Sequence, residues 1–157
     1  MTPAVVQLEA AGVPYRLHTY DHDPATESYG LEAARALDLP SDQVFKTLVA
    51  RLDDTRGTLA VAVIPVDQML DLKALARLAG VKRAAMADPA AAERSSGYVR
   101  GGISPFGQRR PLATYLDDYA TVLDELYVSG GRRGVDISLA PDDFIRVLGA
   151  ITGPLAT

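Results

Sequence analysis

The segment from Gly97 to Gly107, GYVRGGISPFG, contains four glycines, a serine and a proline in eleven residues. Glycine reaches backbone torsions that other residues avoid, and it lets a ligand approach the peptide N–H groups closely. The composition therefore specifies a backbone shape rather than a stretch of core, and it predicts a loop that faces an anionic or carbonyl oxygen of a ligand. A plain surface turn is the alternative.

A second glycine-rich segment, Ser129 to Gly134, follows an apolar stretch and precedes the alternating run Val135 to Leu139. Two such loops in one compact domain suggest that they share a cleft. Neither segment has the G-x-x-x-x-G-K-[ST] pattern or a G-x-G-x-x-G turn after a strand. A nucleotide-hydrolysing P-loop protein is therefore not expected.

The chain has 157 residues, of which 48% are hydrophobic, and it lacks cysteine. These values predict a single domain, 1–157, with one buried core. The absence of cysteine excludes disulfides, a cysteine nucleophile and Cys-ligated zinc. No run approaches the roughly twenty apolar residues of a membrane span, and the N-terminus lacks a signal-peptide pattern. We therefore expect a soluble, cytoplasmic protein that does not act at a membrane.

The formal net charge of −4 argues against a broad nucleic-acid-binding surface. The basic residues nevertheless occur in adjacent pairs, Lys82-Arg83, Arg109-Arg110 and Arg132-Arg133, and two of the pairs adjoin the glycine-rich segments. Local charge decides phosphate contact. Phosphate-binding pairs and ordinary solvated arginines both remain open from the sequence.

Periodicity and capping signals predict an irregular alternation of helices and strands. Helices are expected from Pro3 to Gly12, over Leu31–Leu37, from Asp71 to Gly80, from Asp88, and from Pro141. Strands are expected over Tyr15–Tyr20, Val44–Leu52, Thr58–Pro65, Val81–Met86, Leu112–Leu116, Leu126–Ser129 and Val135–Leu139. Short connectors between consecutive strands favour the α+β class, with a curved, mostly antiparallel or mixed sheet. A parallel doubly wound fold is the second choice.

Lys46 lies in the first predicted hairpin, where the two-residue period places it with Leu48, Ala50 and Leu52 on the apolar side. It either extends to the rim of the sheet or lies at the floor of a pocket. Desolvation would lower its pKa, and an anionic partner would restore the charged form. Asp136, two residues after the second glycine-rich segment, is either solvated or available to pair with Lys46 or a ligand donor.

The sequence offers no conventional catalytic or metal-binding set. The histidines are His18 and His22, which are too few for a histidine-rich metal site, and we predict no metal. Ser104 and Ser129 do not lie in a G-x-S-x-G elbow, and neither has assignable His and Asp partners. Serine-hydrolase chemistry is therefore disfavoured.

Several motifs together resemble the YbaK family of free-standing aminoacyl-tRNA deacylases, and in particular its Cys-tRNA(Pro) deacylase branch. Their order and spacing agree with that family over nearly the whole chain. The motifs are Thr2–Val5, His18–Pro24, Phe45–Leu48, Met86–Pro89, Gly101–Pro105, and Ser129–Gly134 with Asp136.

The resemblance implies a fold like the editing domain of bacterial prolyl-tRNA synthetases and, as substrate, tRNA(Pro) mischarged with cysteine. It implies catalytic roles for Lys46, Gly101 and Asp136, with Gly101 offering its backbone N–H. It also implies that Tyr20 and Tyr29 bound the aminoacyl side chain. The complete set of implied substrate-binding positions is Tyr20, Tyr29, Thr47, Gly102, Ile103, Ser104, Ser129, Gly130 and Arg132.

The family's proposed chemistry needs no enzyme nucleophile and no cofactor, because the cysteinyl thiol of the substrate attacks its own ester carbonyl. Lys46 would hold the terminal phosphate or the reacting group. Two positions depart from the family, Tyr29 in place of phenylalanine and Arg100 in place of an apolar residue. An extra hydroxyl at Tyr29 would make the pocket more polar, and we expect it to admit serine or alanine more readily.

The acidic chain predicts weak, salt-sensitive binding of tRNA, because counterion release scales with the number of phosphates neutralised. The resemblance implies that prolyl-tRNA synthetase supplies the missing selectivity by handing over the acceptor end. The sequence leaves self-association open. Two alternatives are a deacylase for another mischarged tRNA, such as Ala-tRNA(Pro), that uses water, and a non-catalytic module that binds the acceptor end.

Overall fold

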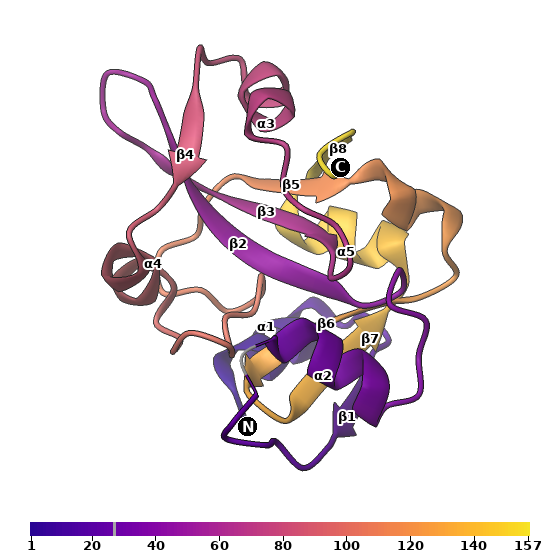
Figure 1. Ribbon diagram of the computed structural model, residues 1–157. Coiled ribbons are helices and arrows are strands. Elements are labelled where there is room, and N and C mark those ends of the chain that lie inside the picture. Colours follow the sequence, from indigo (N-terminus) through magenta and orange to yellow (C-terminus); the bar gives the residue numbers. More distant parts are fainter. Residues whose placement is uncertain (27) are drawn as a thin grey trace.

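The computed structural model describes residues 1–26 and 28–157, and it contains two β-sheets that pack together through a shared core (Figure 1). The smaller sheet is antiparallel, in the order β1 (Arg16–Thr19), β7 (Val135–Leu139), β6 (Leu126–Arg132). The larger sheet has the order β4 (Ala84–Met86), β2 (Phe45–Leu52), β3 (Leu59–Pro65), β5 (Thr114–Asp117), β8 (Ile151–Gly153). It is mixed, since β2 is antiparallel to β3 and β4, whereas the β3–β5 and β5–β8 pairs are parallel.

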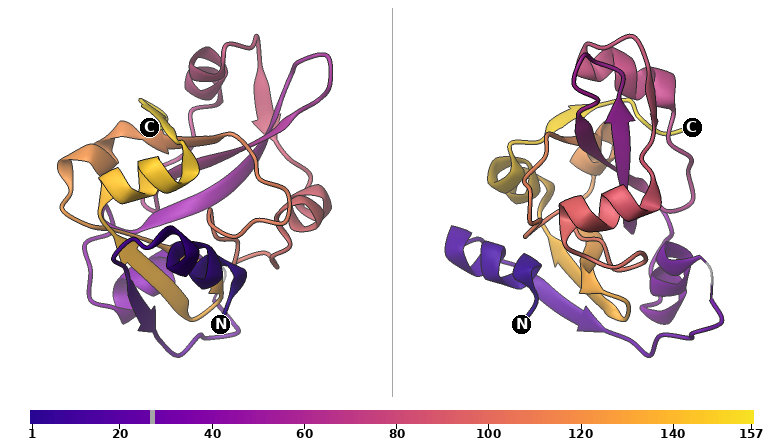
Figure 2. Two further views of the ribbon diagram at one scale, coloured as in Figure 1. Left: turned by 180° about the vertical axis from the view of Figure 1, so that it is seen from behind. Right: turned by 90° about the vertical axis from the view of Figure 1, so that its left-hand side faces the viewer.

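Helices cover the sheets on several sides. They are α1 (Pro3–Ala11), α2 (Tyr29–Ala36), α3 (Leu72–Ala79), α4 (Pro89–Ser96), the 3₁₀ helix η1 (Asp118–Val122) and α5 (Pro141–Leu148). Thr2 caps α1, and Asp71 caps α3 by accepting the Ala74 N–H at 3.0 Å, as the sequence predicts. The helices α1 and α2 lie on opposite faces of the smaller sheet (Figure 2).

The main core lies between the two sheets. Phe45 and Val63 of the larger sheet pack in one cluster with Val128 and Ile137 of the smaller sheet, and α1 and α5 contribute to the same cluster. A second cluster lies on the other face of the larger sheet under α3. A third, smaller cluster joins α2 to the Tyr127 face of the smaller sheet. The face of the smaller sheet under α2 is therefore only partly filled by apolar side chains.

The α+β class is confirmed, and so are most of the elements predicted from the sequence. The structure differs in having two sheets, and it adds β8 and η1, which carry too little apolar periodicity to be recognised. The helix predicted from Leu31 begins at Tyr29. The strand predicted over Val81–Met86 shortens to β4, because only its last part pairs with β2.

The second glycine-rich segment is not a free loop. Its residues Ser129 to Arg132 form the end of β6, with an irregular register between Ser129 and Arg132 opposite β7. A Cβ at Gly130 would lie 2.7 Å from Cγ1 of Val135, so this position needs a residue without a side chain. The glycines therefore allow close packing within the smaller sheet.

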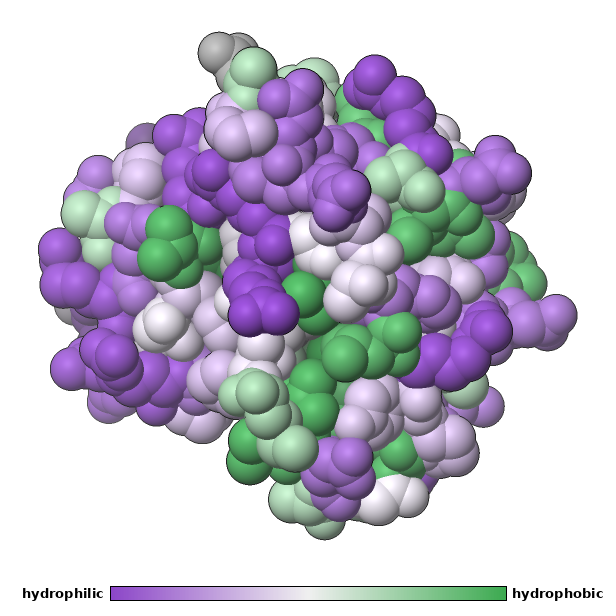
Figure 3. Space-filling view, turned by 90° about the horizontal axis from the view of Figure 1, so that it is seen from below, coloured by the Kyte–Doolittle hydropathy of each residue, from purple (hydrophilic) through white to green (hydrophobic). Residues whose placement is uncertain are grey.

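The surface seen from below in Figure 3 is mostly hydrophilic, with hydrophobic side chains gathered in a central band. Among the exposed apolar residues of the N-terminal elements, Val6 on α1 and Leu17 on β1 are each 52% exposed. This face of the molecule therefore mixes polar and apolar side chains. Within the described parts of the chain, no helix is both long and apolar enough to cross a membrane.

Candidate active site

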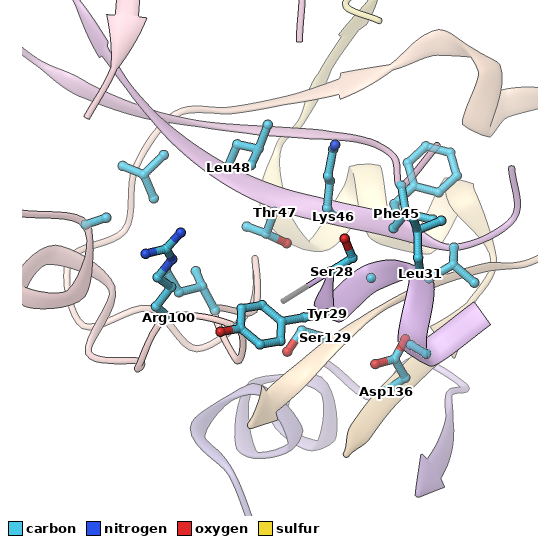
Figure 4. Close-up of a pocket in the computed structure, with 18 of the residues that line it drawn as sticks. Ser28, Tyr29, Leu31, Phe45, Lys46, Thr47, Leu48, Arg100, Ser129 and Asp136 are labelled. Atoms are coloured by element: carbon cyan, nitrogen blue, oxygen red, sulfur yellow. The ribbon is translucent and has the colours of Figure 1, made fainter. Parts of the chain in front are cut away.

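A cavity of about 580 Å³ opens between β2, α2, α4, the first glycine-rich segment and the ends of β6 and β7. Its volume is in the usual range for small-molecule sites. It brings together residues that are far apart in sequence, and Figure 4 shows the side chains that border it. Of the predicted site residues, those that line it are Tyr20, Tyr29, Lys46, Thr47, Gly101, Ile103, Ser129, Arg132 and Asp136.

One wall of the cavity is the outer edge of β2. This strand pairs with β3 along its length but with β4 only from Ala50 onward. The Val49 carbonyl accepts the Ala87 N–H at 3.0 Å, so the backbone of Val49 faces away from β3. Since backbone groups alternate along an antiparallel strand, those of Thr47 face the same way. The unpaired edge therefore offers backbone hydrogen-bonding groups, and side chains from both faces of β2 reach the cavity.

Lys46 is half-buried, and this burial lowers its pKa, while the negative charge of Asp67 acts in the opposite direction. In Figure 4 its ammonium lies on the opposite side of β2 from Thr47 and is directed away from Asp136. Accordingly, no ion pair joins Lys46 to Asp136 among the residues that the structure describes. The pairing of Lys46 with Asp136 considered from the sequence does not form here. Lys46 and Thr47 point to opposite faces of β2, and the face of Lys46 is turned away from Asp136.

Asp136 lies in β7 and is only 5% exposed. Within the described residues its carboxyl forms no hydrogen bond or ion pair. Burial raises its pKa to about 7, because the charged form loses hydration without gaining a partner. Burial also raises the pKa of Tyr20 to about 12, and the Asp136 charge adds to this effect. The carboxyl is therefore a buried group that borders the cavity and could accept a donor from a ligand.

Two hydroxyl groups, one buried and one exposed, also border the cavity. The Thr47 hydroxyl is buried and has no hydrogen-bond partner among the described residues. Ser28 precedes α2 as its N-cap, but its side chain makes no capping hydrogen bond. In Figure 4 the two hydroxyls lie in the space between β2 and α2. Buried polar groups are normally paired, so the Thr47 hydroxyl indicates a ligand-binding wall, and the exposed Ser28 hydroxyl lies beside it.

Ser28 was not among the sequence-predicted site residues. Its signal was nevertheless present, because a serine directly before a helical stretch is a typical N-cap. The predicted start at Leu31 placed Ser28 in the preceding polar segment. That segment is held against α2 by Glu32, which accepts the Asp23 N–H at 2.9 Å and contacts His22 Nδ1 at 2.7 Å.

The first glycine-rich segment lies against Tyr29 at one side of the cavity. Gly101 has a φ of +87°, a conformation that favours glycine. Arg133, which sequence analysis singled out only as one of a basic pair, lies over the Tyr29 ring at 4.1 Å from its centroid. It also donates to the Tyr29 hydroxyl at 2.8 Å and to the Arg100 carbonyl at 3.0 Å. Its neighbour Arg132 is exposed and lines the cavity.

Three predicted site residues, Gly102, Ser104 and Gly130, do not line the cavity. Ser104 is fully buried, and its hydroxyl accepts the Phe106 N–H at 3.2 Å within the turn. A Cβ at Gly102 would lie 2.7 Å from Cα of Arg132. These residues shape the two glycine-rich segments and hold them together, and the structure places them behind the residues that border the cavity.

The chain is similar to known proteins over most of its length. Residues 23–147 match the aminoacyl-tRNA editing domain family. EbsC of Enterococcus faecalis, named as a Cys-tRNA(Pro)/Cys-tRNA(Cys) deacylase, is 38% identical over 148 residues, which cover 90% of this chain and 84% of that protein.

ProXp-y of Escherichia coli, named as a multifunctional Ser/Thr-tRNA deacylase, is 31% identical over 88 residues, about half of each chain. A solved structure described as a trans-editing enzyme for prolyl-tRNA synthetase superposes with a TM-score of 0.83. It is 25% identical and covers 100% of this chain and 99% of that one.

Proposed function

This chain belongs to the aminoacyl-tRNA editing domain family, and from that premise we propose that it removes cysteine from Cys-tRNA(Pro). The similarity to EbsC over 90% of the chain supports the amino acid and the reaction class. One structural observation carries the proposal. A single cavity is bordered by Lys46, by the Gly101 backbone and by the buried carboxyl of Asp136.

The proposed reaction uses the substrate's own sulfur. The cysteinyl thiol attacks the ester carbonyl, the bond to the ribose oxygen breaks, and the tRNA leaves with the proton that the thiol gives up. The product is a four-membered thiolactone, which water then opens to free cysteine. The enzyme needs only to fold the aminoacyl group into position and to stabilise the oxyanion. A lost oxyanion donor costs about a hundredfold or more in rate, and Gly101 N–H is the proposed donor.

Asp136 is suited to hold the α-ammonium of the aminoacyl group. A cation that enters the cavity would lower the raised pKa of its carboxyl and make the ionised form favourable. Tyr20 borders the same region and would limit the size of the side chain. Lys46 borders the cavity from the far side of β2, and its flexible stem lets the ammonium hold the acylated RNA end from that side.

Recognition of the rest of the tRNA would depend on few charges. Arg100 and Arg132 are exposed at the cavity mouth in a chain whose net charge is −4. We therefore expect weak and salt-dependent binding of free tRNA, and we propose that prolyl-tRNA synthetase presents the mischarged acceptor end. Such a role would place the protein in the cytoplasm.

The deciding experiment incubates the purified protein with separately prepared Cys-, Ser-, Ala- and Pro-tRNA(Pro). We expect rapid loss of the cysteinyl ester, while the seryl, alanyl and prolyl esters persist, because none of them carries a sulfur nucleophile. Turnover of Ser-tRNA(Pro) at the cysteine rate would reject the thiol mechanism. Turnover of Ala-tRNA(Pro) alone would assign the protein to another editing specificity.

A variant pair separates an enzyme from a binding module. Lys46→Ala should lower deacylation by at least about a hundredfold, whereas Lys73→Ala, at an exposed position on α3, should retain the wild-type rate. Absence of turnover in the wild type, together with measurable binding of aminoacyl-tRNA, would instead support a non-catalytic acceptor-end module.

A further inference from the structure

We propose that Arg133 and Tyr29 form a latch that holds the Arg100–Gly101 backbone over the cavity, and that this latch removes the Tyr29 hydroxyl from the amino-acid pocket. Arg133 is thus a positioning residue, and Tyr29 acts on the amino acid as an apolar ring. This inference rests on the proposed function for its kinetic consequences, but the contacts themselves can be tested without any activity.

The guanidinium of Arg133 contacts two different segments at once. It lies 4.1 Å from the Tyr29 ring centroid, and its terminal nitrogen donates to the Tyr29 hydroxyl at 2.8 Å. Its Nε and terminal nitrogen also donate to the Arg100 carbonyl, at 3.2 and 3.0 Å. Arginine combines a planar fork of donors with a face that stacks on aromatic rings, so lysine cannot reproduce this arrangement.

Gly101 fits directly beneath this latch. A Cβ at this position would lie 2.5 Å from Arg133 Nε and 2.9 Å from Cδ2 of Tyr29. The latch and the proposed oxyanion donor therefore touch, and the position of one fixes the position of the other. A shift of Arg133 would release the carbonyl of Arg100 and, with it, the Gly101 N–H, because both groups belong to the same planar peptide unit.

The same contacts determine what Tyr29 offers to a substrate. In Figure 4 the hydroxyl end of the ring points toward the Arg100 segment, and the opposite end lies near Ser28. The hydroxyl already accepts a hydrogen bond from Arg133. The amino acid would therefore meet the ring and not the hydroxyl, so the tyrosine need not make the pocket more polar, contrary to the expectation from the sequence.

The competing role for Arg133 is a contact to an RNA phosphate. The two roles predict different kinetics. Loss of a phosphate contact raises KM and makes the slope of log KM against log salt less steep by about one unit. Loss of the latch leaves KM and this slope nearly unchanged and lowers kcat, because the oxyanion donor is no longer held in place.

The first test compares three Arg→Gln variants on Cys-tRNA(Pro). Arg133→Gln should lower kcat by about tenfold, the loss expected for a hydrogen-bonded charge, with an unaltered salt slope. Arg132→Gln, its exposed neighbour at the cavity mouth, should instead raise KM and flatten the slope. Arg56→Gln, in an exposed turn, should match the wild type. A flattened slope for Arg133→Gln would overturn the latch.

The second test removes only the hydroxyl. Tyr29→Phe should lower kcat by about threefold and leave the preference for Cys- over Ser-tRNA(Pro) unchanged. The double variant Tyr29→Phe/Arg133→Gln should have the same kcat as Arg133→Gln alone, because the Tyr29 hydroxyl acts through Arg133. If Tyr29→Phe changes the cysteine-to-serine preference by tenfold or more, the hydroxyl faces the substrate and the inference is wrong.

A third measurement does not depend on catalysis. Amide hydrogen exchange over residues 100–103 should become faster in Arg133→Gln than in the wild type, and it should be unchanged in Arg132→Gln. Faster exchange in a protein without deacylase activity would retain the latch and reject the proposed function. Unchanged exchange in Arg133→Gln would reject the latch whatever the activity.

Discussion

Asp136 and Ser138 lie two residues apart on the same face of β7, yet their surroundings are opposite. Ser138 is fully buried, and its hydroxyl lies 2.7 Å from Nε2 of His18 on β1. Asp136 is also buried but has no partner within the described residues. One end of this face is thus a completed polar network, and the other end is a cavity wall. The difference shows which buried polar groups are structural and which await a ligand.

The completed network extends to the surface through Glu125. Tyr127 donates to this carboxylate at 3.1 Å, and Arg16 donates to it at 3.1 Å through Nε. Burial raises the pKa of Glu125, but its hydrogen bonds, led by that from Arg16, outweigh burial and lower the pKa overall. For Asp136 only burial acts, and the pKa rises. Charge compensation, rather than the depth of burial alone, therefore sets the direction of the pKa shift.

The largest expected effect comes from Asp136→Asn. The variant should lose at least about a hundredfold in kcat/KM, because a neutral amide cannot hold an ammonium as a carboxylate does. It should also be more stable than the wild type at pH 8, by roughly 4 kcal/mol, because the wild-type carboxyl is then charged in a buried position and the asparagine amide is neutral. Activity assays and urea unfolding of both proteins measure the two effects.

The stability gain of Asp136→Asn should depend on pH, because burial raises the pKa of the wild-type Asp136 carboxyl. The folded wild type keeps the Asp136 proton up to about pH 7, whereas the unfolded chain releases it near pH 3.8. The wild type therefore loses stability as the pH rises through this window and levels off above it. The advantage of Asp136→Asn should vanish near pH 4. A constant difference between pH 4 and pH 8 would show that Asp136 does not titrate as a buried, unpaired group.

Ser138→Ala tests the completed end of the same face. Removal of the hydroxyl leaves a partly buried ring nitrogen of His18 without this hydrogen bond, which should cost about 1 kcal/mol in unfolding free energy. Deacylation should stay within about twofold of the wild type, since Ser138 does not border the cavity. A large loss of activity in a folded Ser138→Ala protein would mean that the two ends of β7 are functionally coupled.

Thr47→Val and Thr114→Val form a matched pair of similar size. The Thr47 hydroxyl is buried and has no partner in the described part of the chain, so its removal should stabilise the free protein by about 1 kcal/mol while lowering kcat/KM by about tenfold. The Thr114 hydroxyl donates to the Leu112 carbonyl at 3.2 Å, so its removal should destabilise the protein by a similar amount. Stability changes of the same sign in the two variants would contradict the distinction between a hydroxyl that awaits a ligand and one that is already hydrogen-bonded.

The smallest effect is expected at the exposed end of the completed network. Arg16 is an exposed partner of Glu125, and such pairs contribute little because water and salt screen them. Arg16→Gln should lower the melting temperature by less than about 2 °C, and the shift should disappear in about 0.5 M NaCl. A larger, salt-insensitive shift would indicate that the pair supports the partly buried Ser138–His18 contact.

Local signals accounted for much of the fold. Proline and threonine at the start of α1, Asp71 before α3 and the apolar alternation around Lys46 predicted those elements correctly. Short elements such as β8 were missed, because a three-residue strand is defined by its pairing with β5 and not by its own periodicity. Most of the implied site residues line one cavity, although their individual roles stay predictions.

The details that the sequence could not predict are those that depend on packing between distant segments. Ser104 looked like a ligand-facing residue of a glycine-rich loop, but its hydroxyl stabilises a turn in the interior. The sequence left open whether Arg133, like its neighbour Arg132, is solvated or binds phosphate, and the structure shows it stacked on Tyr29 instead. Neither arrangement has a local signature, since adjacent residues in the chain can have unrelated neighbours in space.

The sequence by itself determined the α+β class, the order of most helices and strands, and the family, because these depend on local spacing and on motifs that stand in the chain. Only the tertiary structure decided which polar groups are satisfied. It left Asp136 and Thr47 beside a cavity with no partner in residues 1–26 and 28–157, gave Ser138 a hydrogen-bond partner in His18, and tied the Tyr29 hydroxyl to Arg133. The physical reason is that a side chain's hydration and partners are set by the segments folded against it, whatever its neighbours in sequence.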